Sequence, residues 1–301
     1  MKLLVTGAGG MLGHSFLRLA AGRHESWGIY RSFCPSAPIG RALVMDLTDR
    51  AVVKEQVAAL KPDAIIHTAA LTDVEECERD PLKARQINVE VTKELADLGE
   101  KLGSEVVYIS TDYVFDGKRR DYSEADAPRP INFYGESKLL GEEAVRLFCP
   151  RSLVIRTSIF GFNIQSKIGQ VEYFRESLTG GKFITRFSDQ FSSPIYTGDL
   201  SRVILELLEH RSTGLFHVGG GERVSRYDFA VKVAEAFSLR PGRIRPAPFT
   251  HLEGLAQRPR DSSLCSEKIE RYLKMELPKI GDGLERLKQD LGGHQKSEGK
   301  K

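Results

Sequence analysis

Residues 2–13 read KLLVTGAGGMLG, a short apolar run followed at once by Gly7, Gly10 and Gly13. Glycines at this spacing allow a sharp turn, let backbone N–H groups approach a pyrophosphate, and let the next helix pack closely on the strand. The phosphates would then lie at the positive end of that helix. A helical pattern does follow, over Met11–Ala21. We therefore interpret the stretch as a dinucleotide-binding loop rather than as a purely structural turn.

Short apolar segments alternate with amphipathic ones over the first two-thirds of the chain. The predicted strands are Lys2–Thr6, Trp27–Tyr30, Ala42–Met45, Ala64–Thr68, Glu105–Ser110 and Ser152–Arg156. The predicted helices between them are Met11–Ala21, Arg50–Leu60, Pro81–Leu102 and Tyr134–Phe148. Strands rich in Val, Ile and Leu that alternate with helices are typical of a parallel sheet covered on both faces. The predicted fold class is therefore α/β, a Rossmann-type doubly wound parallel sheet.

The later part of the chain predicts a smaller C-terminal lobe. Residues 160–194 contain Gly180-Gly181 and scattered aromatic residues without a clear period, and the prolines from Pro241 to Pro259 mark a second irregular stretch. Between them the pattern predicts a helix over Gly198–His210, a short strand over Gly214–Val218 and a helix over Ser225–Phe237. We assign residues 1–160 to an NAD(P)-binding Rossmann domain, with returns of the chain near 194–220. Residues 161–290 are assigned mainly to a substrate-binding lobe. The tail, residues 292–301, is expected to be disordered.

Composition argues against several classes of partner. Lys plus Arg exceed Asp plus Glu by 44 − 41 = 3, and the last ten residues supply most of that excess. The nearly neutral body disfavours nucleic-acid binding, which needs a basic surface. No apolar run approaches the roughly 18 residues that span a bilayer, and the N-terminal run is too short for a signal peptide. We expect a cytoplasmic protein with no membrane partner. The four cysteines lie far apart, without the paired spacing of a zinc site.

The residues after the second and third strands bear on the choice of cofactor. Arg31 and Ser32 stand where an acidic residue would bind the ribose hydroxyls of NADH. They suit a 2′-phosphate instead, which favours NADPH; NADH, and a merely solvated arginine, are the alternatives. Asp46 is expected to accept a hydrogen bond from the adenine amino group. The other residues assigned to the cofactor are Leu47, Ser110 and, beside the nicotinamide ribose, Ala69, Ala70 and Leu71.

Tyr134 and Lys138 lie four residues apart in YGESK, so a helix would place them on one face, one turn apart. A free Tyr has a pKa of about 10, and a nearby ammonium would bring that pKa towards the range useful for proton transfer. Lys138 would also hold the nicotinamide ribose. Thr111 follows the fifth strand, at the edge where parallel sheets bind ligands, and its hydroxyl would bond the carbonyl oxygen of a substrate. These three residues are the candidate catalytic set.

Longer motifs point to one family. They are TGAGGMLG, HTAALTDVEECE, STDYVFDG, PINFYGESKLLGE, DQFSSPIYTGDL, GLFHVGGGERVSRYDFA and RPRDSSL. In collinear order, over roughly residues 1–290, they resemble the dTDP-4-dehydrorhamnose reductases of the extended short-chain dehydrogenase/reductase superfamily. The resemblance implies NADPH-dependent reduction of the 4-keto group of a dTDP-4-dehydro-6-deoxy sugar. The favoured case is dTDP-4-dehydrorhamnose to dTDP-L-rhamnose, a step towards cell-wall polysaccharide.

The same resemblance maps Thr111, Tyr134 and Lys138 onto the family's catalytic trio. It also maps Gly10, Met11 and Leu12 onto the contacts of the cofactor diphosphate.

Two positions depart from the family's pattern. Ile159 stands where the family often has a Trp that touches the sugar. Bacterial members that dimerise around magnesium have an acidic residue early in the first helix, where this chain has His14-Ser15. We therefore predict no metal, and a homodimer stays an open possibility.

The residues assigned to the nucleotide-sugar substrate are Thr111, Asp112, Tyr134, Ile159, Gln190 and Arg258. Arginine binds phosphate oxygens in a bidentate way, so Arg258 suits the substrate diphosphate; a salt bridge between loops is the alternative. His67 is expected to be a packed core residue rather than a cofactor contact.

The sequence disfavours two other reactions of the superfamily and leaves one non-enzymatic role open. A dehydratase has Glu after the Asp that follows the strand-end Thr, whereas here Asp112 is followed by Tyr113. An epimerase would hold NAD tightly, against which Arg31 argues. The regulatory beta subunit of methionine adenosyltransferase resembles the same reductases and binds NADP as a protein partner, so a non-enzymatic role stays an alternative.

Overall fold

The computed structural model describes residues 1–31, 35, 38–164, 168–250 and 254–298. Over this part of the chain seven strands form one parallel sheet. They are β1 (Lys2–Thr6), β2 (Glu25–Tyr30), β3 (Arg41–Val44), β4 (Ala64–His67), β5 (Glu105–Thr111), β6 (Leu153–Thr157) and β11 (Gly214–His217). Their order is β11-β6-β5-β4-β1-β2-β3, so the direction of winding reverses between β1 and β4. This is the predicted Rossmann-type sheet, and a ligand crevice is expected at the reversal point.

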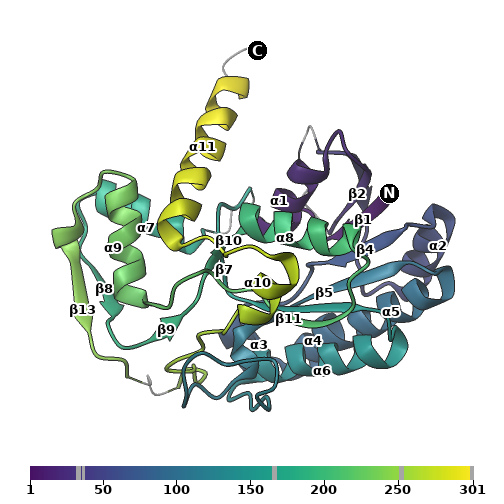
Figure 1. The fold of residues 1–301 in the computed structure, drawn as a ribbon, viewed down its shortest axis with the longest axis horizontal. Coiled ribbons are helices and arrows are strands. Elements are labelled where there is room, and N and C mark those ends of the chain that lie inside the picture. Colours follow the sequence, from purple (N-terminus) through teal and green to yellow (C-terminus); the bar gives the residue numbers. More distant parts are fainter. Residues whose placement is uncertain (32–34, 36–37, 165–167, 251–253, 299–301) are drawn as a thin grey trace.

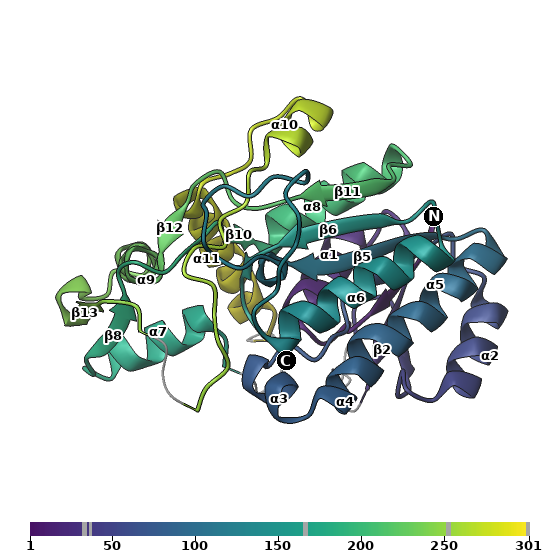
Figure 2. The ribbon, with the colours of Figure 1, turned by 90° about the horizontal axis from the view of Figure 1, so that it is seen from below.

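Helices cover both faces of this sheet (Figure 2). They are α1 (Met11–Ala20), α2 (Arg50–Leu60), α3 (Val74–Arg79), α4 (Pro81–Arg85), α5 (Val91–Leu102), α6 (Phe133–Phe148) and α8 (Thr197–Glu209). Leu3 and Val5 of β1 share one buried cluster with α1 and α8, whereas Leu4 shares another with α2 and α5. Burial on both faces explains why the strands are apolar throughout rather than alternating.

The helix over Pro81–Leu102 forms as predicted, with one local change. Asp80 accepts a hydrogen bond from Lys83 N at 3.0 Å and Pro81 occupies the first turn, so the helix start is the expected one. Between α4 and α5 the helix widens into a π-turn, η1 (Gln86–Glu90). Such turns are frequent at functional sites, and this one faces the start of α6.

The smaller lobe contains more regular structure than the sequence predicted (Figure 1). Its main elements are α7 (Gln170–Thr179), α9 (Arg226–Ala236), β8 (Ile184–Phe187) and β13 (Ile244–Ala247), and its short elements are β7 (Ile159–Phe160), β9 (Phe191–Ser192), β10 (Ile195–Tyr196), β12 (Val224–Ser225) and η3 (Pro241–Arg243). Phe174 of α7 and Phe229 of α9 pack with their ring centroids 6.2 Å apart. Helix α9 is the helix predicted over Ser225–Phe237. The other elements were not predicted, because they pack against partners that are distant in the sequence, as α7 does, and a local pattern does not show such partners.

Parts of the second half return to the large lobe. Helix α8 packs on α1 and β11 pairs with β6, near the expected returns, and α10 (Glu267–Leu273) adds a further return beside β11. Helix α11 (Ile280–Glu298) extends into residues 292–298, which we had expected to lack structure. Ile280, Leu284 and Leu287 bury one side of the first turns of this helix. Once these turns have formed, each further residue adds one backbone hydrogen bond, so the helix can continue beyond them. Within the described residues, no helix combines the length and apolar character needed to cross a membrane.

Candidate active site

The glycine loop has the backbone geometry that a close ligand requires. Gly7 has φ +65°, and a Cβ there would lie 2.8 Å from Ala69 N; a Cβ at Gly13 would overlap the Gly7 carbonyl oxygen. Gly10 precedes the first turn of α1, which carries no side-chain cap and no acidic residue. The N–H groups of this turn, where Met11 and Leu12 stand, are therefore free to bind an anion. The loop fits the pyrophosphate of a dinucleotide.

A relay of hydrogen bonds fixes the segment 69–71 beside this loop. Ala69 N donates to Thr6 Oγ1 at 3.2 Å, and Thr6 Oγ1 bonds His67 Nδ1 at 2.7 Å. On its other side His67 Nε2 bonds Thr92 Oγ1 at 3.0 Å. Burial lowers the pKa of His67 to about 3, so the ring is neutral. His67 is thus the packed core residue that we expected. Through Thr6 it is linked to Ala69, the first residue of the predicted cofactor segment.

Asn88 of the π-turn connects the same segment to α6, the helix that carries Tyr134 and Lys138. Its Oδ1 accepts from Leu71 N at 2.8 Å, and its Nδ2 donates to Leu71 O at 3.0 Å and to Ser137 Oγ at 2.9 Å. Ser137 Oγ in turn donates to Tyr134 O at 2.8 Å. The position of Leu71 relative to α6 is therefore set by one buried amide.

The residues expected at the adenosine end lie at the carboxyl ends of β2 and β3. Arg31 is exposed, and Ser32 lies outside the described residues. Asp46 Oδ1 accepts from Thr48 N at 2.9 Å and from Thr48 Oγ1 at 2.8 Å. These bonds, and then the charge of Arg31, lower the pKa of Asp46, so Arg31 and Asp46 lie within electrostatic reach of each other. Leu47 is partly buried and packs on the apolar cluster that contains Val53 and Val57 of α2.

The structure brings Thr111 and Tyr134 together. Thr111 is the last residue of β5, and Tyr134 lies in the first turn of α6, whose start is fixed by the Asn132 side chain accepting from Gly135 N at 2.8 Å. The Thr111 hydroxyl lies near the Tyr134 phenol, where it acts to lower the pKa of Tyr134, although burial outweighs it. Thr111 Oγ1 also accepts from Tyr113 N at 3.1 Å, which fixes its rotamer. A carbonyl oxygen at this edge would lie beside two hydroxyl groups. Thr111 Oγ1 donates to Asp112 Oδ1 at 3.1 Å in this structure, and would turn from it to bond the carbonyl oxygen.

Lys138 is buried one turn further along α6. Its side chain is 3% exposed, and its Nζ lies 4.1 Å from the centroid of the Tyr108 ring. Burial lowers the pKa of Lys138 to about 7, and Glu142 opposes that change. We expected the ammonium to lower the pKa of Tyr134, but burial raises the pKa of Tyr134 instead. The physical reason is that desolvation of the phenol outweighs the stabilisation of its anion.

The residues expected to bind the substrate have different surroundings. Asp112 is 3% exposed and bonds Ser262 and Thr111, and burial raises its pKa. Gln190 is buried, with Nε2 donating to Pro259 O at 3.2 Å. Arg258 Nη1 pairs with Glu75 Oε1 at 2.7 Å. The salt bridge that was the alternative for Arg258 is therefore present, but its partner lies on α3 rather than in a second loop. Ile159, in β7, is 36% exposed. Ser110 donates its hydroxyl to Glu142, so that hydroxyl is turned inward from the cofactor edge.

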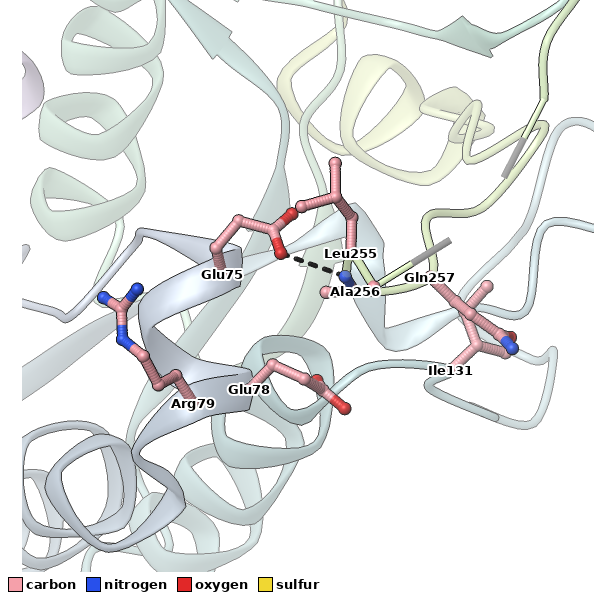
Figure 3. Close-up of a pocket in the computed structure, with 8 residues that line it drawn as sticks. Glu75, Glu78, Arg79, Ile131, Leu255, Ala256 and Gln257 are labelled. Carbon is pink, nitrogen blue, oxygen red and sulfur yellow. Dashed lines mark hydrogen bonds between the residues drawn. The ribbon is translucent and has the colours of Figure 1, made fainter. Parts of the chain in front are cut away.

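A pocket of about 620 Å³ lies next to the start of α6 (Figure 3). It is lined by Glu75, Glu78, Arg79, Ile131, Gly254, Leu255, Ala256 and Gln257. Glu75 Oε2 accepts from Ala256 N at 3.0 Å, the dashed line in Figure 3. Glu78 Oε2 accepts from Phe133 N at 2.9 Å, and Asn132 Nδ2 donates to Gln257 O at 2.8 Å. The pocket thus adjoins the helix that carries Tyr134, although the sequence assigned no role to the residues that line it.

Sequence reasoning also missed a contact between the two lobes. The rings of Tyr113 and Tyr134 meet edge to face, with centroids 6.0 Å apart. Arg226, at the start of α9, donates from Nη2 to Tyr113 Oη at 3.5 Å. Each of the two residues lies in a motif of the family resemblance, but nothing local indicates that they meet across 113 positions. The smaller lobe therefore reaches Tyr134 through Arg226 and Tyr113.

Known proteins are similar in sequence to this chain over most of its length. The probable low-salt glycan biosynthesis reductase Agl14 of Haloferax volcanii is 34% identical, over 95% of this chain and 97% of its own. Methionine adenosyltransferase 2 subunit beta of Danio rerio is 31% identical, over 89% of this chain and 84% of its own.

Within the described residues no group of His, Cys, Asp and Glu side chains could hold a metal ion.

Solved structures agree with these relatives. A hypothetical dTDP-4-dehydrorhamnose reductase from Sulfolobus tokodaii superposes with a TM-score of 0.83 at 40% identity, over 94% of this chain and 99% of that chain. The dTDP-4-dehydrorhamnose reductase of Bacillus anthracis, solved in complex with NADP, gives 0.83 at 28% identity, over 96% and 99%. Residues 1–292 match the family described as RmlD substrate binding domain. The chain therefore belongs to this family, within the extended short-chain dehydrogenase/reductases that its motifs had indicated.

Proposed function

We propose that this nucleotide-sugar reductase uses NADPH to reduce the 4-keto group of a dTDP-4-dehydro-6-deoxy sugar, with dTDP-4-dehydrorhamnose, giving dTDP-L-rhamnose, as the favoured substrate. One observation carries the proposal: Thr111 and Tyr134 present two hydroxyls at the end of β5, at the same sheet edge as a loop shaped for a pyrophosphate. The relatives named as reductases support the reaction class. The proposal includes a cytoplasmic location, where nucleotide cofactors and nucleotide sugars are found.

The residues at this edge divide the work of a carbonyl reduction. NADPH, when bound, supplies the hydride that reaches C4 of the sugar. Tyr134 O–H and Thr111 O–H then both bond the carbonyl oxygen, on which negative charge builds. Tyr134 gives its proton to that oxygen, and its raised pKa keeps the phenol protonated until then. Lys138, as an ammonium, holds the nicotinamide ribose and stabilises the phenolate that remains.

The decisive experiment follows the loss of NADPH absorbance with the purified protein, with and without a dTDP-4-keto-6-deoxy sugar. Oxidation that requires the sugar, together with a reduced dTDP-sugar product, would support the proposal. A protein that binds NADPH tightly but reduces neither dTDP- nor UDP-4-keto sugars would contradict it. That outcome would favour a non-enzymatic role as the subunit of a complex; the Danio rerio relative is named as a subunit beta.

Arg31→Ala tests the cofactor assignment. If Arg31 binds the 2′-phosphate, the variant should bind NADPH about 10- to 150-fold more weakly, since a charge-assisted contact contributes about 1.5–3 kcal/mol. NADH affinity should stay nearly unchanged. Arg41→Ala is the matched control. Arg41 begins β3 and so lies at the amino end of that strand, whereas Arg31 follows the carboxyl end of β2. Equal losses for both cofactors, measured by fluorescence titration, would contradict the assignment.

Thr111→Val tests the second hydroxyl. We expect a fall in kcat of about tenfold or more, yet a smaller one than for loss of the tyrosine hydroxyl, because one donor to the carbonyl oxygen remains. Thr111→Ser keeps a hydroxyl on the same backbone and should recover most of the rate. Val also removes the acceptor for Tyr113 N, so thermal unfolding must be measured beside the kinetics. If Ser is as slow as Val, the hydroxyl is not the group that matters.

A further inference from the structure

Glu142 is a fully buried carboxylate that sequence analysis left unassigned. It is 0% exposed, on α6. Ser110 Oγ donates to its Oε1 at 2.5 Å, and Arg156 donates from Nε to Oε1 at 2.9 Å and from Nη2 to Oε2 at 2.7 Å. Arg156 itself is 2% exposed. The bidentate arginine and the hydroxyl fix the orientation of this carboxylate, which forms a buried ion pair with Arg156.

This carboxylate lies one helical turn from Lys138. Residues four apart on a helix are neighbours on one face, with Cβ atoms roughly 5–6 Å apart. Lys138 lies over the ring of Tyr108, and Glu142 bonds Ser110, two residues further along β5 and therefore on the same face of the sheet. The helix lies tightly on this strand, since a Cβ at Gly141 would overlap the Tyr108 hydroxyl. Lys138 and Glu142 are thus enclosed side by side between α6 and β5.

The other titratable groups around Lys138 are uncharged at neutral pH. Besides Glu142 they are Tyr134 on α6, Tyr108 on β5, His67 on β4 and Cys77 on α3. Burial raises the pKa of both phenols and raises the pKa of the Cys77 thiol to about 11, while it lowers the pKa of His67 to about 3. Arg156, on β6, binds both oxygens of the carboxylate. Among the described residues around Lys138, Glu142 therefore supplies the negative charge.

We propose that Glu142 is a positioning residue of this enzyme: its buried carboxylate, held by Arg156 and Ser110, keeps Lys138 an ammonium at neutral pH. The inference rests on the proposed function, in which Lys138 acts as a cation. Burial lowers the pKa of Lys138 to about 7, and Glu142 raises it. Without the carboxylate, burial alone would govern, and Lys138 would lose its proton at lower pH.

Glu142→Gln tests this with a readout that does not depend on turnover. NADPH affinity is measured by fluorescence over about pH 5.5–8.5, and kcat/KM over the same range. The charged lysine exists below its pKa, so in the parent protein affinity should weaken as pH rises through about 7. In the variant the same weakening should begin at least about one pH unit lower, because an opposite charge within a few ångströms shifts a pKa by roughly 1–3. The factor by which the variant binds NADPH more weakly than the parent protein should therefore be larger at about pH 8 than at about pH 5.5.

Two further variants separate this effect from simple damage to the fold. Glu143→Gln makes the same charge change on the next residue, which is exposed, and should leave the profile unmoved. Glu142→Gln alone leaves the buried Arg156 unpaired and should lose stability, so the double variant Glu142→Gln/Arg156→Gln removes both charges. If the folded double variant shows the shifted profile, the proposal stands. If its profile matches the parent's, or affinity falls equally at every pH, the role is structural and the proposal is overturned.

The affinity profiles also keep the two proposals apart. A parent protein that binds NADPH but reduces no sugar would contradict the proposed function. The difference between parent and variant in the pH at which NADPH affinity weakens would still decide whether Glu142 controls the charge of Lys138.

Discussion

Tyr134→Phe is expected to lower kcat by about 10²–10⁴-fold and to change the affinity for NADPH little. Phe keeps the ring, and with it the packing against Tyr113, whose centroid lies 6.0 Å away. What disappears is the hydroxyl that lies near Thr111 and, in the proposed function, carries the transferred proton. Because burial holds the pKa of Tyr134 above its usual value, the phenol is protonated across the physiological range. The rate loss should therefore be similar at every pH where the parent is active.

Tyr113→Phe is the matched control, since it removes a phenol hydroxyl beside the same site. That hydroxyl contacts Arg226 at 3.5 Å, at the weak end for a hydrogen bond. We expect kcat to fall less than tenfold, since the edge-to-face ring contact with Tyr134 remains. Single-turnover kinetics on both variants, with each 4-keto sugar that the parent accepts, check the assignment. Near-normal reduction by Tyr134→Phe would show that the proton comes from elsewhere.

The parts of the site that local sequence determines could be predicted. The glycine loop needs only a strand, a turn and a helix start within 13 residues, and the structure places them there. The spacing of Tyr134 and Lys138 follows from one helical turn, and Thr111 from the end of one strand. The sheet follows from apolar segments that are buried on both faces, as Leu3 and Leu4 show.

Burial and distant contacts could not be predicted in the same way. Glu142 looks in the sequence like an exposed charge on an amphipathic helix, because acidic residues are rarely fully buried. Only the sheet brings Arg156 to it from the next strand. The pKa of Lys138 depends on that same enclosure, and Arg226 reaches Tyr113 only because the smaller lobe folds back. The strands and helices that were missed, such as α7 and β8, likewise depend on partners far along the chain.

Lys138→Met is expected to have two opposite effects, a loss of function and a gain in stability. Turnover should fall by about 10²–10⁴-fold and NADPH affinity should weaken as well, because the ammonium supports both the tyrosine and the nicotinamide ribose. Met fills a similar volume without a charge, and Glu142 keeps Arg156 as its ion-pair partner. No buried charge is therefore left unpaired by the substitution.

The gain in stability follows from the pKa of the buried lysine. Folding lowers it from 10.5 to about 7, so the unfolded chain binds the proton more tightly. Below about pH 7 this costs the folded state up to roughly 5 kcal/mol, and the cost shrinks as pH rises towards 10.5. Lys138→Met should therefore stabilise the protein by a few kcal/mol at about pH 6, and by less at about pH 9. Urea unfolding at both pH values measures the difference, with Lys101→Met, an exposed lysine on α5, as the unchanged control. A variant that is destabilised equally at both pH values would mean that the folded protein does not bury a charged lysine at this position.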